Sequence, residues 1–291
     1  MITQIVTCKS LNLLKETINS INIDSIVIEL GNCTETEIWC HDNYIRFEKS
    51  NNCTNLSEVR NKFIQGKTLL LNAGEIVKTD VNDYDSATIL IKDKNLLSKE
   101  IRITSEDNIK GHVFEYVDSD LYEESDIKIN QMQNNNLINF KQKMSEKELS
   151  KNPLKKENLL WDAYSDLAQE KYDRFCYKAY YYLKKFDSKY LLYQLLLVRL
   201  YCYDDYDYIE KALPVLFDYK LNLAEFWCLL GDLKFKQQNY SDCINPYKIA
   251  IECGKSIDVD LNFPIDLTRY KNHPCKMIEL SKNNNPSLLE I

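Results

Sequence analysis

The chain has 291 residues and a net formal charge of −7, and 44% of its residues are hydrophobic. This acidic balance argues against non-specific binding to nucleic acid, which depends on Lys and Arg side chains neutralising phosphates. No apolar run approaches the roughly 18 residues of a membrane span, and no signal-peptide pattern opens the chain, so we expect a cytoplasmic protein with no nucleic acid partner and no membrane span.

The first 130 residues alternate apolar, β-branched runs with helical patterns, which predicts an α/β N-terminal domain with a reduced, mixed sheet. Helices are predicted from Ser10, a capping residue type, to about Ser20, and over Asn55–Gln65. The predicted strands are Ile2–Thr7, Ser25–Leu30, Tyr44–Phe47, Thr68–Leu71, Thr88–Ile91, Ile101–Thr104, Val113–Val117 and Ile127–Ile129.

A polar passage, Gln131–Asn136, comes after the last predicted strand and is interpreted as a connector. Leu137–Ser150 then has a helical pattern. We therefore assign residues 131–156 to a connector and a linking helix that separate the α/β domain from the C-terminal half of the chain.

Three tyrosines, Tyr172, Tyr206 and Tyr240, are spaced at intervals of 34 residues, the period of the tetratricopeptide repeat. Around them, three copies of a helical hairpin pattern run over residues 157–254. One such unit cannot bury its apolar face alone, so the pattern predicts a stacked all-α array, and arrays of this kind usually bind a partner. The copies supply apolar or small residues at matching offsets: Leu159, Ala163, Phe175, Ala179 and Tyr182; Tyr193, Leu196, Ile209, Leu213 and Leu216; Trp227, Leu230, Gly231, Cys243, Tyr247 and Ala250.

Three further expectations concern this half of the chain. Pro246 lies inside the last repeat, where it should kink the second helix or remove one hydrogen bond. The tail, residues 255–291, should contain a short helix around Cys275–Leu280. The tyrosine cluster Tyr177, Tyr180, Tyr181 and Tyr182 is interpreted as packing between repeats rather than as a stacking platform.

In an open α/β sheet, ligands bind beyond the carboxyl ends of the strands. Two polar segments come directly after predicted strands there, Glu29-Leu30-Gly31-Asn32 and Asn72-Ala73-Gly74-Glu75. The helix that begins near Asn55 offers an N-terminus to an anion. Arg60 in that helix either adds a cation for a diphosphate or is a surface residue paired with a neighbouring acid such as Glu58.

The order of these segments resembles family-2 glycosyltransferases that carry tetratricopeptide repeats at their C-terminus. The matching segments are Ile28–Glu35, Leu56–Asn61, Leu71–Glu75, Gly111–Glu115 and Lys147–Pro153. The resemblance implies a GT-A-like fold that binds a nucleoside-diphosphate sugar as donor. Within it, Glu29 would contact the nucleobase, next to Gly31 and Asn32, and Arg60 would lie near the diphosphate.

The same resemblance places Asn72 and Gly74 on the two aspartates that hold a divalent metal in the family. Magnesium and manganese prefer anionic oxygen ligands, which Asn and Gly do not supply. Two family histidines are also replaced, by Phe114 and Asn130. We therefore assign no metal ligands and regard a divalent metal as doubtful, and we keep Glu75 and Glu115 as carboxylates for general-base catalysis or for a metal contact.

Two functional hypotheses arise from this resemblance. The first is a glycosyltransferase of hexosyltransferase type that transfers a sugar from its nucleotide to a protein or other acceptor presented by the repeats. The second is a catalytically inactive scaffold, a pseudoenzyme that acts as a protein-interaction module through its repeats. A homodimer is a separate possibility, because repeat arrays often self-associate. The second predicts that aspartates restored at Asn72 and Gly74 would gain metal binding. A third reading, a repeat scaffold with an unrelated α/β cap, leaves the ordered N-terminal segments unexplained.

Overall fold

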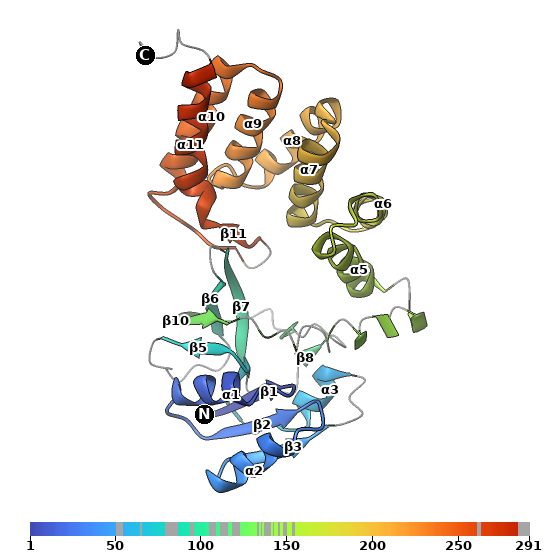
Figure 1. Ribbon diagram of the computed structural model, residues 1–291, viewed down its shortest axis with the longest axis vertical. Coiled ribbons are helices and arrows are strands. Elements are labelled where there is room, and N and C mark those ends of the chain that lie inside the picture. The colour runs from blue at the N-terminus through green and yellow to red at the C-terminus, as the bar shows by residue number, and fades with distance from the viewer. Residues whose placement is uncertain are drawn as a thin grey trace. The chain divides into compact units, whose positions relative to one another are not determined.

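The computed structural model divides into two compact units, Met1–Lys94 with Lys99–Asp162 and Asn95–Ser98 with Ala163–Ile291 (Figure 1). Each unit is described by itself. The structure describes residues 1–50, 55–64, 66–78, 87–93, 96–104, 109–110, 116–117, 123–132, 134, 136, 141, 143–144, 146–147, 150–152, 155–260 and 263–284.

The first unit is built on a mixed sheet whose strands run in the order β3-β2-β1-β4-β7-β6-β10-β5. Four neighbouring strands at one side are parallel: β1 (Ile2–Thr7), β2 (Ser25–Glu29), β3 (Arg46–Lys49) and β4 (Thr68–Asn72). The sheet continues through β7 (Leu96–Thr104), β6 (Ala87–Asp93), β10 (Glu123–Gln131) and β5 (Glu75–Val77), where β7 is antiparallel to β4 and β5 is antiparallel to β10. A separate ribbon pairs β8 (Ile109–Lys110) with β9 (Tyr116–Val117).

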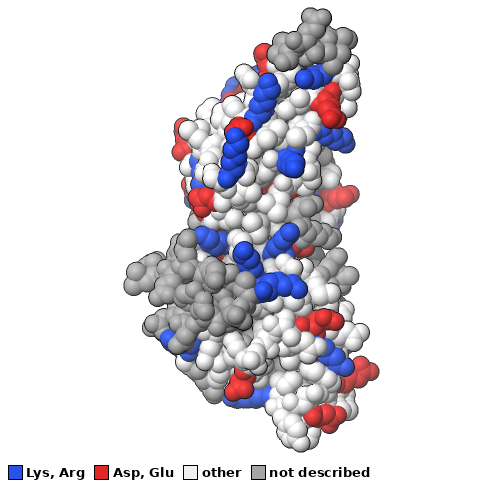
Figure 2. All heavy atoms as spheres, turned by 90° about the vertical axis from the view of Figure 1, so that its left-hand side faces the viewer, with Lys and Arg blue, Asp and Glu red and all other residues white. Residues whose placement is uncertain are grey.

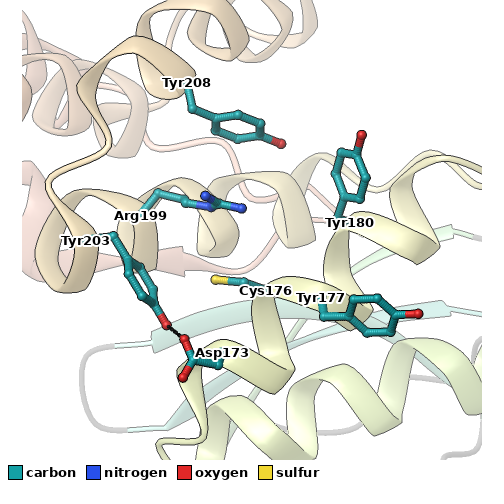
Figure 3. Close-up of a pocket in the computed structure, with 7 residues that line it drawn as sticks. All are labelled: Asp173, Cys176, Tyr177, Tyr180, Arg199, Tyr203 and Tyr208. Carbon is teal, nitrogen blue, oxygen red and sulfur yellow. Dashed lines mark hydrogen bonds between the residues drawn. The ribbon is translucent and has the colours of Figure 1, made fainter.

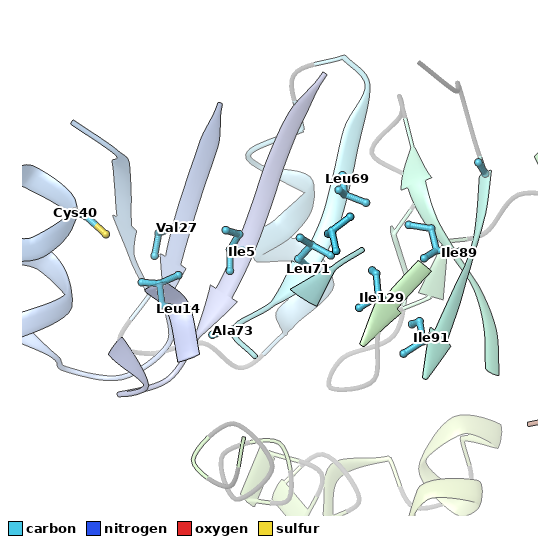
Figure 4. Close-up of a cluster of buried hydrophobic side chains, with 12 residues drawn as sticks. Ile5, Leu14, Val27, Cys40, Leu69, Leu71, Ala73, Ile89, Ile91 and Ile129 are labelled. Atoms are coloured by element: carbon cyan, nitrogen blue, oxygen red, sulfur yellow. The ribbon is translucent and has the colours of Figure 1, made fainter. Parts of the chain in front are cut away.

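Alternation along the parallel strands divides their apolar side chains between the two faces of the sheet. One face packs beneath α1 (Leu11–Asn19) and α2 (Thr34–Asp42), where Leu14 and Cys40 join a cluster with Ile5, Val27 and Leu71 (Figure 4). The other face packs against α3 (Leu56–Asn61), whose Leu56 and Val59 join Val6, Ile26 and Ile28. Because both faces are covered, β2 and β4 are largely continuous apolar runs, as the sequence indicated, whereas the edge strand β3 is mostly charged.

The sequence located the parallel strands well but missed α2, β5 and the two-residue strand β8. The helix α2 was not predicted, because among its residues only Thr36 and Cys40 are buried, which leaves almost no apolar stripe. The strand β5 was missed because it is only three residues long. The predicted strand Tyr44–Phe47 begins later than expected, at Arg46, since Tyr44 takes a left-handed conformation (φ 57°) after α2. Positions 111–115 and most of the predicted helix 137–150 lie outside the described residues.

The second unit is a helical array, as predicted, and the 34-residue spacing of the tyrosines is its structural period. The residues Tyr172, Tyr206 and Tyr240 each begin the second helix of a hairpin. The hairpins are α5 (Lys156–Ala168) with α6 (Tyr172–Leu183), α7 (Lys189–Tyr203) with α8 (Tyr206–Tyr219), and α9 (Ala224–Lys236) with α10 (Tyr240–Cys253). Helix α10 continues through Pro246, and α8 likewise contains Pro214.

The C-terminal tail is part of this core rather than an appendage. The ring of Phe263 is fully buried and lies 5.2 Å from the rings of Tyr190 and Phe226. After the short strand β11 (Ile265–Asp266) and the 3₁₀ turn η1 (Leu267–Tyr270), α11 spans Asn272–Asn284, longer than the predicted Cys275–Leu280. The tail therefore closes the array by filling its apolar interior.

A buried carboxylate joins the tail to the helical hairpins. Asp232, which is 2% exposed, accepts hydrogen bonds from Tyr201 (2.5 Å), Tyr247 (2.7 Å), Arg269 (2.8 Å) and His273 (2.6 Å). Burial alone would raise the pKa of Asp232, but its hydrogen bond and charge interactions with His273 and the charge of Arg269 outweigh that effect and lower it. The carboxylate thus remains ionised at the centre of four donors.

The close contact between Gly231 and Tyr247 generates a stability prediction. A Cβ atom at Gly231 would lie 2.6 Å from Cε1 of Tyr247, whose ring is buried and held by Asp232. We expect Gly231→Ala to destabilise the second unit by about 1–3 kcal/mol through overpacking, measured by urea denaturation. The exposed change Lys248→Ala on α10 is the control, and equal stability of the two variants would contradict the packing seen here.

The buried carboxyl group of Glu225 should make the stability of the second unit depend on pH. It is 1% exposed, accepts hydrogen bonds from Asp266 N (2.6 Å) and Tyr270 Oη (3.0 Å), and has a pKa raised by burial to about 7. The folded protein therefore keeps a proton that the unfolded chain releases near its ordinary pKa, so this site contributes stability at low pH that is lost between about pH 4.5 and pH 7.

We expect Glu225→Gln to remove that loss, so the variant gains stability relative to wild type by up to about 3 kcal/mol between pH 5 and pH 8. Denaturation of both proteins across this range measures the difference. The exposed change Glu252→Gln is the control. A constant difference between the Glu225 variant and wild type would show that Glu225 does not titrate in this window.

Candidate functional site

The carboxyl ends of β2, β1 and β4 lie side by side at one edge of the first unit's sheet. The chain winds outward from β1 to β2 and β3 and then returns to β4 on the other side of β1, so strand order reverses between β1 and β4. The register pairs Thr7 with Glu29 and Val6 with Asn72. The end of β1 is thus flanked by Glu29 and Asn72, at the point where open α/β sheets bind ligands.

Glu29 holds together the loops that come after β1 and β2. It is fully buried, and its Oε1 accepts hydrogen bonds from the backbone N–H groups of Lys9 (3.0 Å) and Gly31 (2.9 Å). A Cβ atom at Gly31 would lie 2.9 Å from that oxygen, so the close approach requires glycine. Burial raises the pKa of Glu29, and the two backbone hydrogen bonds together with an interaction of its carboxylate with the Thr36 side chain partly offset that rise. Asn32, beyond this loop, is exposed.

Arg60 is buried beneath α3 rather than displayed on the surface. It is 1% exposed, and its Nη2 donates to the carbonyl of Leu71 (3.0 Å) and to Oδ1 of Asn72 (3.1 Å). Its Nη1 donates to the carbonyl of Gln4 (3.4 Å), and Gln4 Nε2 donates in return to the carbonyl of Arg60 (3.1 Å). The interpretation of Arg60 as a surface residue is therefore wrong. Its guanidinium donates hydrogen bonds to residues at the end of β4.

The polar residues after β4 form a closed network with Arg60. Glu75, which is 1% exposed, accepts hydrogen bonds from the backbone N–H (2.7 Å) and side-chain amide (3.0 Å) of Asn72. Arg102 on β7 lies 3.3 Å from the same carboxylate, and its Nη1 donates to the carbonyl of Leu70 (3.4 Å). We call Arg60, Asn72, Glu75 and Arg102 the strand-end network. In it the amide of Asn72 joins Arg60 to Glu75, and Arg102 contacts the Glu75 carboxylate directly.

Asn72 and Gly74, the two positions that the resemblance aligned with metal-binding aspartates, have structural roles in this protein. The Oδ1 of Asn72, its one candidate ligand atom, faces a guanidinium at 3.1 Å, and this positive charge opposes a metal cation. Gly74 has a φ of 101° and closes the tight turn between β4 and β5, where its N–H donates to Thr17 Oγ1 (2.8 Å). Among the described residues, no group of three or more His, Cys, Asp and Glu side chains is placed to hold a metal.

Asparagines from the predicted connector lie across the point where strand order reverses. Asn134, which is 6% exposed, donates to the carbonyl of Ala73 (2.9 Å) and accepts from the hydroxyl of Ser10 (2.9 Å). Asn136 donates to the carbonyl of Lys9 (2.9 Å). Ser10 consequently precedes α1 without capping it. Sequence reasoning missed these two residues, since a run of asparagines indicates only a polar connector.

The remaining predicted residues add less to this edge. Glu115 and the rest of its segment, including Phe114, lie outside the described residues, so its catalytic assignment stays a prediction. Asn130 is exposed on β10. The helix α3 begins at Leu56 with Asn55 as its cap, as predicted, but it has only six residues, so its dipole offers an anion little.

Comparison with known proteins gives no relative for this site: no family model matches the chain, and no curated protein matches it. Among the described residues, no helix combines the length and apolar character needed to cross a lipid bilayer.

The strand-end network generates a prediction that separates a structural from a ligand-binding role. Without the guanidinium of Arg60, Asn72 and the Leu71 carbonyl lose buried, charge-assisted hydrogen bonds. We expect Arg60→Met to destabilise the first unit by about 2–4 kcal/mol, measured by urea denaturation. The control is Lys62→Met, an exposed change at the end of the same helix. Unchanged stability of the Arg60 variant would mean that its guanidinium is available for a ligand.

Proposed function

We propose that this chain is a binding module in which a glycosyltransferase-like α/β unit supports a tetratricopeptide-type array that recognises a protein partner. The strand-end network carries the proposal. A metal-dependent transferase needs free anionic oxygens and free cations at the strand ends, whereas Arg60, Glu75 and Arg102 bond to one another through Asn72 or to backbone carbonyls.

The connector asparagines support the same proposal. A nucleotide bound between the ends of β1 and β4 would approach the loop carbonyls of Lys9 and Ala73, and these carbonyls accept hydrogen bonds from Asn136 and Asn134. A ligand there would have to displace the buried amide of Asn134 and the exposed amide of Asn136 and replace their bonds. Buried polar groups are costly to leave without partners, so the covered edge favours a structural role for this region.

The array supports the interaction side of the proposal through its period. Each 34-residue copy supplies a hairpin, and most of the repeat positions that the sequence marked are buried, including Ala163, Ile209 and Cys243, whereas Leu159, Trp227 and Leu230 are half-buried. Arrays built this way present broad surfaces to partners. On the face in Figure 2, Lys and Arg side chains occur together with Asp and Glu, a mixture that suits a protein surface better than a polyanion.

A nucleotide-sugar transferase is the second candidate, and one observation favours it. Glu29 is a buried carboxylate at the end of β2, and besides the backbone N–H groups of Lys9 and Gly31 only the hydroxyl of Thr36 interacts with it among the described residues, so a nucleobase N–H could replace that hydroxyl as a donor. In this reading Glu29, Gly31 and Asn32 bind the nucleobase of the donor. Glu75 or Glu115 acts as the general base that takes a proton from the acceptor.

Isothermal titration of the full chain with uridine and guanosine diphosphate sugars, with and without Mn²⁺, separates the two candidates. We expect no binding to wild type and none to Asn72→Asp, because Arg60 remains beside that position. The change at Gly74 is not a useful restoration of the metal motif, since its φ of 101° and the carbonyl of Met132, 3.1 Å from a Cβ atom there, make a side chain strained. Turnover of any nucleotide sugar by wild type would contradict the proposal.

A second experiment tests directly whether the chain binds a protein partner. We expect the immobilised full chain to retain a protein from a lysate of its source cells, and the free chain, added in excess, to compete it away. The interaction role would be contradicted if the immobilised chain retained no protein, or if the free chain did not compete with it for the retained protein.

A further inference from the structure

A tyrosine-rich cavity of about 520 Å³ lies in the helical array between α6, α7 and α8 (Figure 3). Its volume is in the range of ligand-binding pockets. Four tyrosines, Tyr177, Tyr180, Tyr203 and Tyr208, line it together with Arg199 and Asp173. All of these residues belong to the second unit, so the cavity is complete within one part of the molecule.

The tyrosines around this cavity are displayed rather than packed between repeats. The expectation that the cluster packs is right for Tyr182, which is 1% exposed, but wrong for Tyr177 and Tyr180, which are 74% and 45% exposed. Tyr203 is also 42% exposed. Large apolar faces left open on a folded surface mark interaction sites more often than single exposed residues do.

The charges at the cavity are compensated within it. Asp173 accepts a hydrogen bond from the hydroxyl of Tyr203 at 2.5 Å. Arg199 donates through Nη1 to Asp205 at 2.8 Å, and its guanidinium lies 4.9 Å from the centre of the Tyr208 ring. A strongly anionic ligand would meet the carboxylate of Asp173 and a guanidinium that is already paired with Asp205, and a cation would meet that guanidinium. The cavity therefore favours a ligand without net charge.

The polar groups that remain available are the guanidinium of Arg199, which can only donate, and two tyrosine hydroxyls, which can donate or accept. Nη2 of Arg199 makes no hydrogen bond to an oxygen of a described residue, and the same holds for the hydroxyls of Tyr177 and Tyr180. In Figure 3 the guanidinium points into the space between Tyr208, Tyr180 and Cys176. A matching ligand is rich in acceptors, poor in donors, and has flat apolar surfaces for the rings.

A proline-containing peptide segment in the polyproline II conformation has these properties. Its carbonyls form no internal hydrogen bonds, proline brings no N–H donor that would need a partner, and pyrrolidine rings pack on exposed aromatic faces. The conformation is already restricted before binding, so less entropy is lost on docking.

We propose that the cavity between α6, α7 and α8 binds an extended, proline-containing segment of a protein partner, with the tyrosine rings contacting proline and Arg199 donating to a peptide carbonyl. The inference rests on the proposed function, because it names the segment through which the array recognises its partner.

Fluorescence anisotropy of the full chain with a panel of labelled ten-residue peptides tests the occupant. Each proline-containing peptide has a counterpart with glycine in place of proline, and lysine-rich and glutamate-rich peptides represent the two charged ligand classes. We expect at least one proline-containing peptide to bind and its glycine counterpart to bind far more weakly. Failure of every proline-containing peptide, or preference for either charged class, would overturn the proposal.

Two substitutions locate the binding. Tyr177→Ala and Tyr180→Ala remove exposed rings and should leave folding intact, and each should weaken peptide binding by about tenfold. Tyr44→Ala, at a tyrosine 98% exposed in the first unit, is the matched control and should change nothing. Equal binding by the Tyr177 variant and this control would overturn the assignment to this cavity.

The partner-capture experiment distinguishes failure of the cavity inference from failure of the proposed function. A partner that is retained by wild type and equally by the Tyr177 and Tyr180 variants would overturn the cavity inference and leave the proposed function standing. Loss of capture by wild type itself would overturn the proposed function.

Discussion

The buried guanidinium of Arg60 is the constraint on which the strand ends of the first unit depend. A charge that leaves water needs hydrogen bonds to replace its hydration. Here they come from the Leu71 and Gln4 carbonyls and from Asn72, which in turn fixes Glu75. The loop after β4 therefore has little freedom to rearrange around a ligand, because any rotation of Asn72 would take a hydrogen bond from both Arg60 and Glu75.

Asparagine at position 72 suits this network better than aspartate would. Its amide accepts from Arg60 with one atom and donates to Glu75 with the other, so it joins a cation to an anion. An aspartate would place two carboxylates in contact, and one would have to take up a proton or move. Asparagine at position 72 is thus chemically consistent with the cation and the anion on either side of it.

Sequence reasoning predicted β1, β2 and β4 because fully buried strands are apolar along their whole length, and it predicted the array because the tyrosine period repeats. It missed α2, which buries too few residues to show a stripe. It selected Arg60 and Asn72 but could not place them in a network, since burial of an arginine depends on carbonyls from strands distant in sequence. Asn134 shows the same limit: its polar side chain indicates a loop, and only the fold brings Ser10 and Ala73 to it.

The carboxylate of Asp232 has a consequence for how the chain reaches its folded state. Its partners are separated from it by 31 residues on one side and up to 41 on the other, so the contacts are far from local. Non-local contacts require costly loop closure and form slowly. During synthesis, α7 and α9 would emerge well before Arg269 and His273. Asp232 in the last hairpin therefore lacks two of its four hydrogen-bond donors until Arg269 and His273 have left the ribosome.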